Sequence, residues 1–224
     1  MIEVVLILLG YLSGSVPTAY IVGRLIGHID VRDYGSGNPG ASNVWMQIGK
    51  SIGFLVGVFD ILVKGTLPVI IAMNFIYNDL FIICVGLAAV VGHNWSIYMK
   101  FSGGRGIAVA AGALLALYPP LFLISFLTAC VGHLVFRNGG MWVGIALVAL
   151  PFWAFLLGVS TETLIFCFML IPILAVKRLF PGSRSANAGV SGFSMYINRL
   201  IYDRDTKSRE DWIRRSPLDS TKGD

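Results

Sequence analysis

The chain has 224 residues, of which 56% are hydrophobic and only 13% charged, and its formal net charge is +5. A soluble domain carries about 25% charged residues, so this composition, with a mean hydropathy of +0.77, excludes an ordinary soluble protein. It predicts an all-α, polytopic membrane protein. The first apolar run has no basic residue before it and only Glu3 as a charge, so we interpret it as a retained transmembrane helix and not as a signal peptide.

Seven apolar runs are predicted to cross the bilayer. A spanning helix needs about 20 mainly apolar residues, and fewer where the protein shelters its end. The fourth and fifth runs are short and are separated only by Pro119-Pro120, which could instead kink one long helix. The runs are Ile2–Gly23, Ser51–Tyr77, Leu80–Tyr98, Gly106–Tyr118, Leu121–Phe136, Met141–Val159 and Thr163–Val176.

The distribution of basic residues favours seven spans over six. With seven spans and the N-terminus outside, every Lys and Arg except Lys64 falls on the cytoplasmic side, whereas six spans would move Arg137 and the basic tail outside. We therefore predict a membrane domain over residues 1–176 and a polar cytoplasmic C-terminal tail over residues 177–224. Within this tail, Arg199 to Trp212 could form a helix on the membrane surface or a mobile segment.

The first candidate site is Gly35–Asn43, with the sequence GSGNPGASN. Successive backbone amides in Gly-rich turns form concave nests that bind anions, and glycine lets the main chain come close to a phosphate. The alternative is a solvated turn between two helices. On the predicted topology this segment faces the same cytoplasmic side as a second Gly-rich stretch, Ser102–Gly106, so the two could build one site.

The second candidate site is Gly92–Gly106, with the sequence GHNWSIYMKFSGGRG. Its Gly-rich turn leads into an apolar helix, where free N–H groups, the helix dipole and Arg105 suit a phosphate. The pattern is neither a Walker A loop nor a Rossmann fingerprint, because GxxxxGK[ST] and a preceding strand are absent. His93 is the only histidine beside this turn. It could be a general base or a phosphate ligand, or simply a hydrogen-bonded histidine at a helix end.

Asp60 and Lys64 lie four residues apart inside the second apolar run, so they share one helix face and can pair. Ionisable groups at membrane depth mark a functional site by default, but a structural ion pair that holds helices together is an equal alternative. The cysteines and histidines show no ligand spacing, so no metal is expected. A covalent serine enzyme lacks support, so a transfer reaction would rest on positioning and charge stabilisation.

In order and spacing, these motifs resemble the acyl-phosphate-dependent glycerol-3-phosphate acyltransferases of bacteria, the PlsY family. The resemblance is close over roughly the first half of the chain. The matching residues are Gly14-Ser15 with Pro17, Asp30, Arg32, GSGNPGASN at 35–43, Gly49-Lys50, DILVKG at 60–65 and GHNWSIYMKFSGGRG at 92–106.

The resemblance implies a seven-helix enzyme of phospholipid biosynthesis in the inner (plasma) membrane, with its site on the cytoplasmic side. Its partners would be acyl-phosphate, glycerol 3-phosphate and membrane lipid, with no coenzyme A, no other cofactor, no metal and no nucleic acid. The product would be lysophosphatidic acid. Carried over by position, the catalytic residues would be Ser36, Asn38, Asn43 and His93, and the substrate- or phosphate-binding residues Gly37, Gly40, Lys50, Lys64, Gly103, Gly104, Arg105 and Gly106.

An acyl phosphate is a mixed anhydride, so the reaction implied by the resemblance needs no nucleophile from the protein. It requires two anionic groups to be held side by side, which amide nests and cations can do. The general base could be the phosphate of the donor itself, with His93 as the competing base.

Two features depart from the family pattern. Arg105 stands where the family usually has Lys, so a planar fork replaces a point charge. The family's third motif, His-xx-Asn followed by Arg-Leu and Gly-x-Glu, is matched only in part, by Lys177-Arg178-Leu179 or by Asn198-Arg199-Leu200. Reduced activity, a different acceptor or a replacement residue such as Asn187 stay open. The alternative function is a divergent relative that binds or moves a phosphorylated lipid or metabolite without acylating it.

Overall fold

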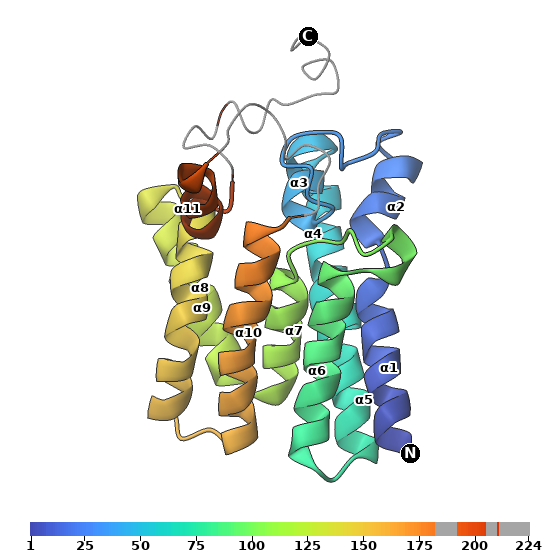
Figure 1. The fold of residues 1–224 in the computed structure, drawn as a ribbon, viewed down its shortest axis with the longest axis vertical. Coiled ribbons are helices and arrows are strands. Elements are labelled where there is room, and N and C mark those ends of the chain that lie inside the picture. The colour runs from blue at the N-terminus through green and yellow to red at the C-terminus, as the bar shows by residue number, and fades with distance from the viewer. Residues whose placement is uncertain (182–191, 205–209, 211–224) are drawn as a thin grey trace.

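The computed structural model describes residues 1–181, 192–204 and 210, and the regular elements in these ranges are helices that stand side by side in one bundle (Figure 1). Two helices are irregular: η1 is a π-helix and η2 a 3-10 helix. In chain order the elements are α1 (Ile2–Ser15), α2 (Thr18–Leu25), α3 (Ala41–Gln47), α4 (Lys50–Phe59), η1 (Asp60–Thr66), α5 (Leu67–Phe75), α6 (Asp79–Asn94), η2 (Ile97–Met99), α7 (Ile107–Leu117), α8 (Pro119–Phe136), α9 (Gly139–Leu156), α10 (Thr161–Leu179) and α11 (Phe193–Tyr202).

Helices occupy each of the seven places at which the sequence predicts a span. Within the described residues, five stretches are long and apolar enough to cross a membrane, and α7 is a shorter apolar helix. α10 continues to Leu179, beyond the predicted domain boundary. The five stretches are Ile2–Leu25, Lys50–Phe75, Asp79–Met99, Pro119–Phe136 and Gly139–Leu156.

The Pro119-Pro120 pair separates two helices that pack against each other, and does not kink one long helix. α7 ends at Leu117 and α8 begins at Pro119, with Tyr118 extended between them. Proline pushes the residue before it out of the helical region and is well placed in a first helical turn. The prediction of two separate helices at this point is therefore confirmed.

The first predicted span is broken at Val16 and Pro17, where α1 ends and α2 begins. Proline lacks an N–H and disfavours a helical conformation of the preceding residue. The break leaves backbone carbonyls of the helix free to accept other hydrogen bonds. Ser96 Oγ donates to the Ser15 carbonyl at 2.5 Å, and Ser15 Oγ donates to the Gly92 carbonyl at 3.2 Å. These bonds join the break to α6.

The second predicted span is continuous but widens into the π-helix η1, which contains Asp60 and Lys64. Such segments occur frequently at functional sites. Gly65 and Gly112 let η1 and α7 approach each other closely, because a Cβ at Gly65 would lie 2.3 Å from the Val109 carbonyl oxygen. The sequence reasoning treated this span as an ordinary α-helix, so the π-helix was not predicted.

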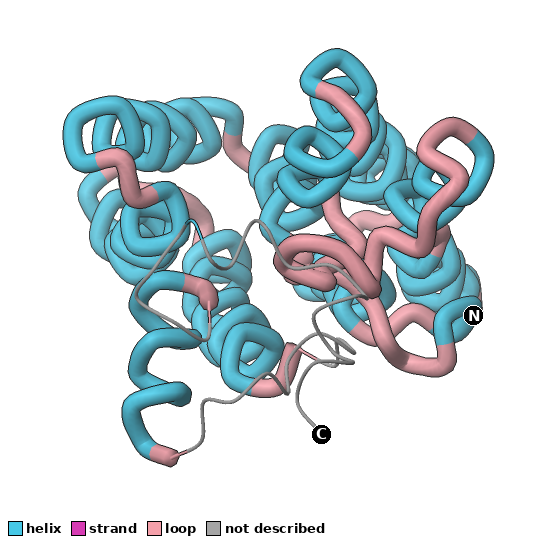
Figure 2. The backbone as a smooth tube through the Cα atoms, turned by 90° about the horizontal axis from the view of Figure 1, so that it is seen from above, coloured by secondary structure: helices cyan, strands magenta, loops and turns pink. Residues whose placement is uncertain are grey.

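The loops and short helices gather at one end of the bundle, shown at the top of Figure 1 and seen from above in Figure 2. The α2 to α4 region, the loop between α6 and α7, and α11 all lie there, whereas α1 begins at the opposite end. α11 packs on α9 and α10. It begins at Phe193 and ends at Tyr202, earlier than the surface helix considered from Arg199 to Trp212. Asn187 lies outside the described residues.

Candidate active site

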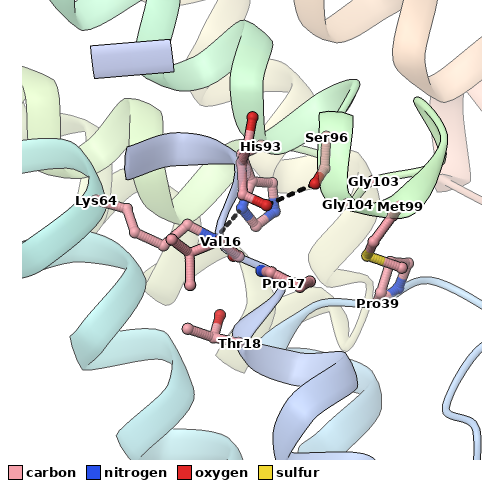
Figure 3. Close-up of a pocket in the computed structure, with 11 residues that line it drawn as sticks. Val16, Pro17, Thr18, Pro39, Lys64, His93, Ser96, Met99, Gly103 and Gly104 are labelled. Atoms are coloured by element: carbon pink, nitrogen blue, oxygen red, sulfur yellow. Dashed lines mark hydrogen bonds between the residues drawn. The ribbon is translucent and has the colours of Figure 1, made fainter. Parts of the chain in front are cut away.

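A small pocket lies where the break in the first span meets the two Gly-rich segments (Figure 3). Its volume is about 10 Å³, which is close to the minimum for one water molecule. Side chains or loops must therefore shift before a phosphoryl group can enter. The residues that line it are Ser15, Val16, Pro17, Thr18, Pro39, Lys64, His93, Ser96, Met99, Gly103 and Gly104.

Lys64 joins three segments of the bundle at this pocket. Its Nζ lies 3.1 Å from Asp60 Oδ1, donates to the Val16 carbonyl at 2.7 Å and lies 2.9 Å from His93 Nδ1. The Thr18 hydroxyl donates to Asp60 Oδ1 at 2.7 Å. The predicted Asp60–Lys64 pair is thus confirmed, and both side chains are at most 2% exposed. The pair holds the broken helix, and it also reaches the histidine that lines the pocket.

The contact with Lys64 fixes how His93 can act. Because Lys64 pairs with a carboxylate, its amine is an ammonium that can only donate, so Nδ1 of His93 accepts and the ring proton is on Nε2. Nε2 faces the second Gly-rich turn, since a Cβ at Gly104 would lie 2.3 Å from it. His93 therefore presents a hydrogen-bond donor to the turn, which suits an anion better than it suits proton abstraction.

Backbone hydrogen bonds join the second Gly-rich turn to the end of α6. Gly103 N–H donates to the Asn94 carbonyl at 3.1 Å, and Gly104 N–H donates to the His93 carbonyl at 3.0 Å. Gly106, with φ +71°, is the N-cap of α7. The Asn94 side chain is fully buried against Gly106, and both of its polar atoms lack a hydrogen-bond partner in the part of the chain that the structure describes.

The first Gly-rich segment folds back on itself, as the sequence predicts. Gly35 and Gly37 have φ +55° and +65°, a region that favours glycine. Asn43 Oδ1 accepts the Ser36 N–H at 3.3 Å, and Asn43 Nδ2 donates to the carbonyls of Val31 at 2.7 Å and Tyr34 at 3.1 Å. Asn43 is buried, and its side-chain hydrogen bonds hold the loop that carries Ser36.

A charged cluster anchors the loop just before this segment. Arg32 Nη2 lies 2.6 Å and Arg24 Nη2 3.0 Å from Asp30 Oδ2, and the Arg32 guanidinium stacks 4.8 Å from the Tyr20 ring centroid. The hydrogen bond from Arg32 holds the pKa of Asp30 below its usual range. Asp30 and Arg32, which carried part of the family resemblance, thus have a clear structural role.

The pocket brings together only part of the predicted site. Lys64, His93, Gly103 and Gly104 line it directly. Ser36 and Asn38 lie on the loop that contributes Pro39, and the Ser36 hydroxyl accepts the Asn38 N–H at 3.2 Å. The other predicted residues do not line the pocket: Gly37 and Gly40 belong to the same loop, Asn43 lies in the first turn of α3, Lys50 is exposed at the start of α4, and Arg105 and Gly106 follow the second turn.

Sequence reasoning missed Thr18, Asn94 and Asp203. Thr18 follows the only proline of the first apolar run, and that proline was the signal for a break. Asp203, at the end of α11, lies 2.8 Å from Arg105 Nη1 through its Oδ2. No spacing signal connects residues so far apart in the chain.

The chain is similar to known acyltransferases over nearly its whole length. A family model described as Glycerol-3-phosphate acyltransferase matches residues 4–180. Glycerol-3-phosphate acyltransferase 4 of Dehalococcoides mccartyi (strain CBDB1) is 38% identical over 215 residues, which cover 92% of this chain and 91% of the relative. The glycerol-3-phosphate acyltransferase of Rubrobacter xylanophilus is 44% identical over 157 residues, which cover 70% and 77%.

The fold is also similar to that of a solved membrane enzyme. The glycerol 3-phosphate form of PlsY, an integral membrane glycerol 3-phosphate acyltransferase, is 27% identical and superposes with a TM-score of 0.78 over 99% of both chains. Its lysophosphatidic acid form gives a TM-score of 0.76 over 97% of both chains.

Proposed function

This chain belongs to the glycerol-3-phosphate acyltransferase (PlsY) family of membrane acyltransferases, and we propose that it transfers an acyl group from acyl-phosphate to the 1-hydroxyl of glycerol 3-phosphate. The product is lysophosphatidic acid, a precursor of phospholipids. One observation carries the proposal beyond family membership. The pocket joins the Lys64–His93 pair, the Gly103-Gly104 turn and the loop of Ser36 at one place, which supports a site for anionic substrates.

In the proposed reaction the glycerol 3-phosphate hydroxyl attacks the acyl carbonyl carbon. A new ester C–O bond forms, the bond between the acyl carbon and the phosphate oxygen breaks, and inorganic phosphate leaves. The hydroxyl proton ends on the departing phosphate, whose oxygens can serve as the base, so the protein needs no nucleophile of its own.

The protein's part is to hold charge and geometry. The Nε2–H of His93 and the first N–H groups of α7, whose N-cap is Gly106, bind phosphate oxygens, with Arg105 as a cation beside them. The N–H groups of Gly103 and Gly104 already donate to the carbonyls of Asn94 and His93, so this turn contributes its shape and places His93. Ser36 and Asn38 orient the glycerol 3-phosphate, while Asn43 keeps their loop in shape. The contact between Lys64 and His93 Nδ1 supports a donor role for His93 over that of a base.

We also propose that the site faces the cytoplasm from the inner membrane. The segments that carry most basic residues lie at one end of the bundle, opposite the start of α1 (Figure 1), and the loop between α6 and α7, which helps to line the pocket, lies at the same end. The positive-inside rule assigns such an end to the cytoplasm. An acceptor as polar as glycerol 3-phosphate would reach the pocket from there.

A purified-protein assay tests the proposed function. The protein in detergent or lipid receives acyl-phosphate and glycerol 3-phosphate, and lysophosphatidate is measured, with acyl-coenzyme A as a control donor. Ser36→Ala is expected to abolish transfer while the protein stays folded and inserted. A wild-type rate in this variant would remove Ser36 from the site.

A second candidate function is a relative that binds a phosphorylated metabolite without acylating it. One observation favours it. When the third motif is aligned on Lys177-Arg178-Leu179, its His and Asn positions fall on Pro172 and Ala175 of α10. Detectable binding of glycerol 3-phosphate without product in the same assay would support this function over the enzyme.

A further inference from the structure

Three cationic side chains from two distant segments meet beside the second Gly-rich turn. Arg105 comes from the turn itself, and Lys177 and Arg178 come from the end of α10. The Arg105 side chain is 13% exposed, Lys177 1% and Arg178 6%. We call Arg105, Lys177 and Arg178 the cationic cluster. Among the described residues, Asp203 is the carboxylate that pairs with this cluster.

The two arginines of the cluster have structural partners. Arg178 Nη1 donates to the Leu200 carbonyl at 2.8 Å and Nη2 donates to the Gly140 carbonyl at 2.9 Å, which ties α11 and α9 to α10. Arg105 Nη1 lies 2.8 Å from Asp203 Oδ2, and Arg178 Nε lies 3.7 Å from Asp203 Oδ1. Asp203 therefore pairs with both arginines.

Lys177 differs from both arginines. Its ammonium makes no hydrogen bond or ion pair with any residue of the described chain, and it lies over the Trp95 ring, whose centroid is 5.6 Å from Nζ. Lys177 is close enough to Arg105 and to His93 for their charges to interact. Lys177 is therefore a member of the cationic cluster that is also near the histidine of the pocket.

A buried ammonium without a counterion is costly. An unpaired buried charge loses its hydration, and the face of a tryptophan replaces only part of it. Repulsion from Arg105 adds to this cost. An ionisable side chain kept at such a position points to function. A bound anion would offset this cost, and the N-terminus of α7, which follows Arg105 in the chain, favours an anion too.

We propose that Lys177 is a phosphate-binding residue of the site, whose ammonium pairs with a phosphoryl group of a bound substrate. The identity of that substrate rests on the proposed function, because acyl-phosphate and glycerol 3-phosphate both carry a phosphate. Lys177 comes from α10, so it extends the anion-binding surface beyond the two Gly-rich segments. It supplies a compact point charge, which the paired arginines do not.

Binding of inorganic phosphate and of glycerol 3-phosphate to the purified protein, measured by calorimetry, tests this role without turnover. Lys177→Met is expected to weaken phosphate binding roughly ten- to hundredfold, the range for one lost charge-assisted hydrogen bond. Lys177→Arg keeps the charge and should keep most of the affinity. Arg137→Met removes an exposed cation at the end of α8, outside the residues that line the pocket, and is the control, with binding as in the wild type.

Thermal stability separates a binding role from a structural one. Without phosphate, Lys177→Met should melt at or above the wild-type temperature, because it removes an unpaired buried charge. Added phosphate should raise the melting temperature of the wild type more than that of the variant. Unfolding of both Lys177→Met and Lys177→Gln would make Lys177 a structural residue and overturn the proposal, as would wild-type phosphate affinity in a folded Lys177→Met.

The KM values of Lys177→Met for the two substrates identify which phosphate Lys177 binds. A rise in the KM for glycerol 3-phosphate alone assigns the acceptor, and a rise in the KM for acyl-phosphate alone assigns the donor. Phosphate binding that depends on Lys177 in a protein that forms no lysophosphatidate would refute the proposed function and leave this inference standing. Lysophosphatidate formation at the wild-type rate in a Lys177 variant would refute this inference and leave the proposed function standing.

Discussion

Removing the carboxylate of Asp60 is expected to destabilise the bundle, because Lys64 would be left charged and buried. Both side chains are at most 2% exposed, so solvent screens the pair little. In Asp60→Leu the ammonium keeps only the Val16 carbonyl and His93 Nδ1 as partners. Breaking a buried pair costs about 3–5 kcal/mol. We expect the lower end, about 3 kcal/mol, because charged groups also find partners in an unfolded membrane protein.

The double variant Asp60→Leu with Lys64→Met distinguishes structure from function. It removes both charges, so it should recover most of the lost stability. The Thr18 hydroxyl and the Val16 carbonyl lose their partners, but both residues are half-buried, so these groups can form hydrogen bonds with water. It should not recover activity. Without the Lys64 donor, His93 loses the contact that orients its ring, and such misplacement costs on the order of 100-fold in rate.

Unfolding in detergent and initial rates of lysophosphatidate formation measure the two effects. Asp79→Asn, which removes an exposed carboxylate at the start of α6, is the control and should change stability by less than about 0.5 kcal/mol. A wild-type rate in the double variant would show that the pair is structural only. An Asp60→Leu single variant as stable as the wild type would refute the account of the ion pair itself.

Three further predictions concern other parts of the site. Gly104→Ala should lower the rate of transfer and reduce the free energy of unfolding by about 1–3 kcal/mol, because the new Cβ would lie 2.3 Å from His93 Nε2. Gly57→Ala is the control for the same unfolding and rate assays, and it should be tolerated because its Cβ would have its nearest neighbour at 3.4 Å. His93→Gln should keep more activity than His93→Phe if the ring acts as a donor, and equal, complete loss in both rate measurements would favour a base. Asp30 has a lowered pKa, so its stabilisation is complete above about pH 4 and is lost as the pH falls through the folded pKa. The difference in melting temperature between wild type and Asp30→Asn should therefore shrink with acidification below that pH, and a constant difference would contradict the role of the Arg32 contact.

Local patterns in the sequence predicted the elements well. Apolar run length located the helices, and the spacing of Asp60 and Lys64 predicted a pair that the structure confirms. The glycines of the first loop predicted a segment that folds back on itself, and Gly35 and Gly37 have the backbone conformation that requires them. Each of these features depends on residues close together in the chain, so the sequence carries the signal directly.

Contacts between distant segments could not be predicted in the same way. Nothing in the spacing of Lys64 and His93 indicates that their side chains lie 2.9 Å apart, because that contact depends on how α6 packs against η1. The Arg105–Asp203 pair depends on the placement of α11. The catalytic role of Asn43 stays a prediction, and its side-chain hydrogen bonds to Val31, Tyr34 and Ser36, which hold the loop, could not be predicted from the sequence.

The most direct test of the central claim is the stoichiometry of the reaction with purified wild-type protein. Acyl-phosphate and glycerol 3-phosphate are supplied together, and lysophosphatidate and inorganic phosphate are measured in the same samples. The proposed reaction predicts one phosphate released for each lysophosphatidate formed, with no product when acyl-coenzyme A replaces acyl-phosphate. Product from acyl-coenzyme A, or no product although glycerol 3-phosphate binds, would contradict it.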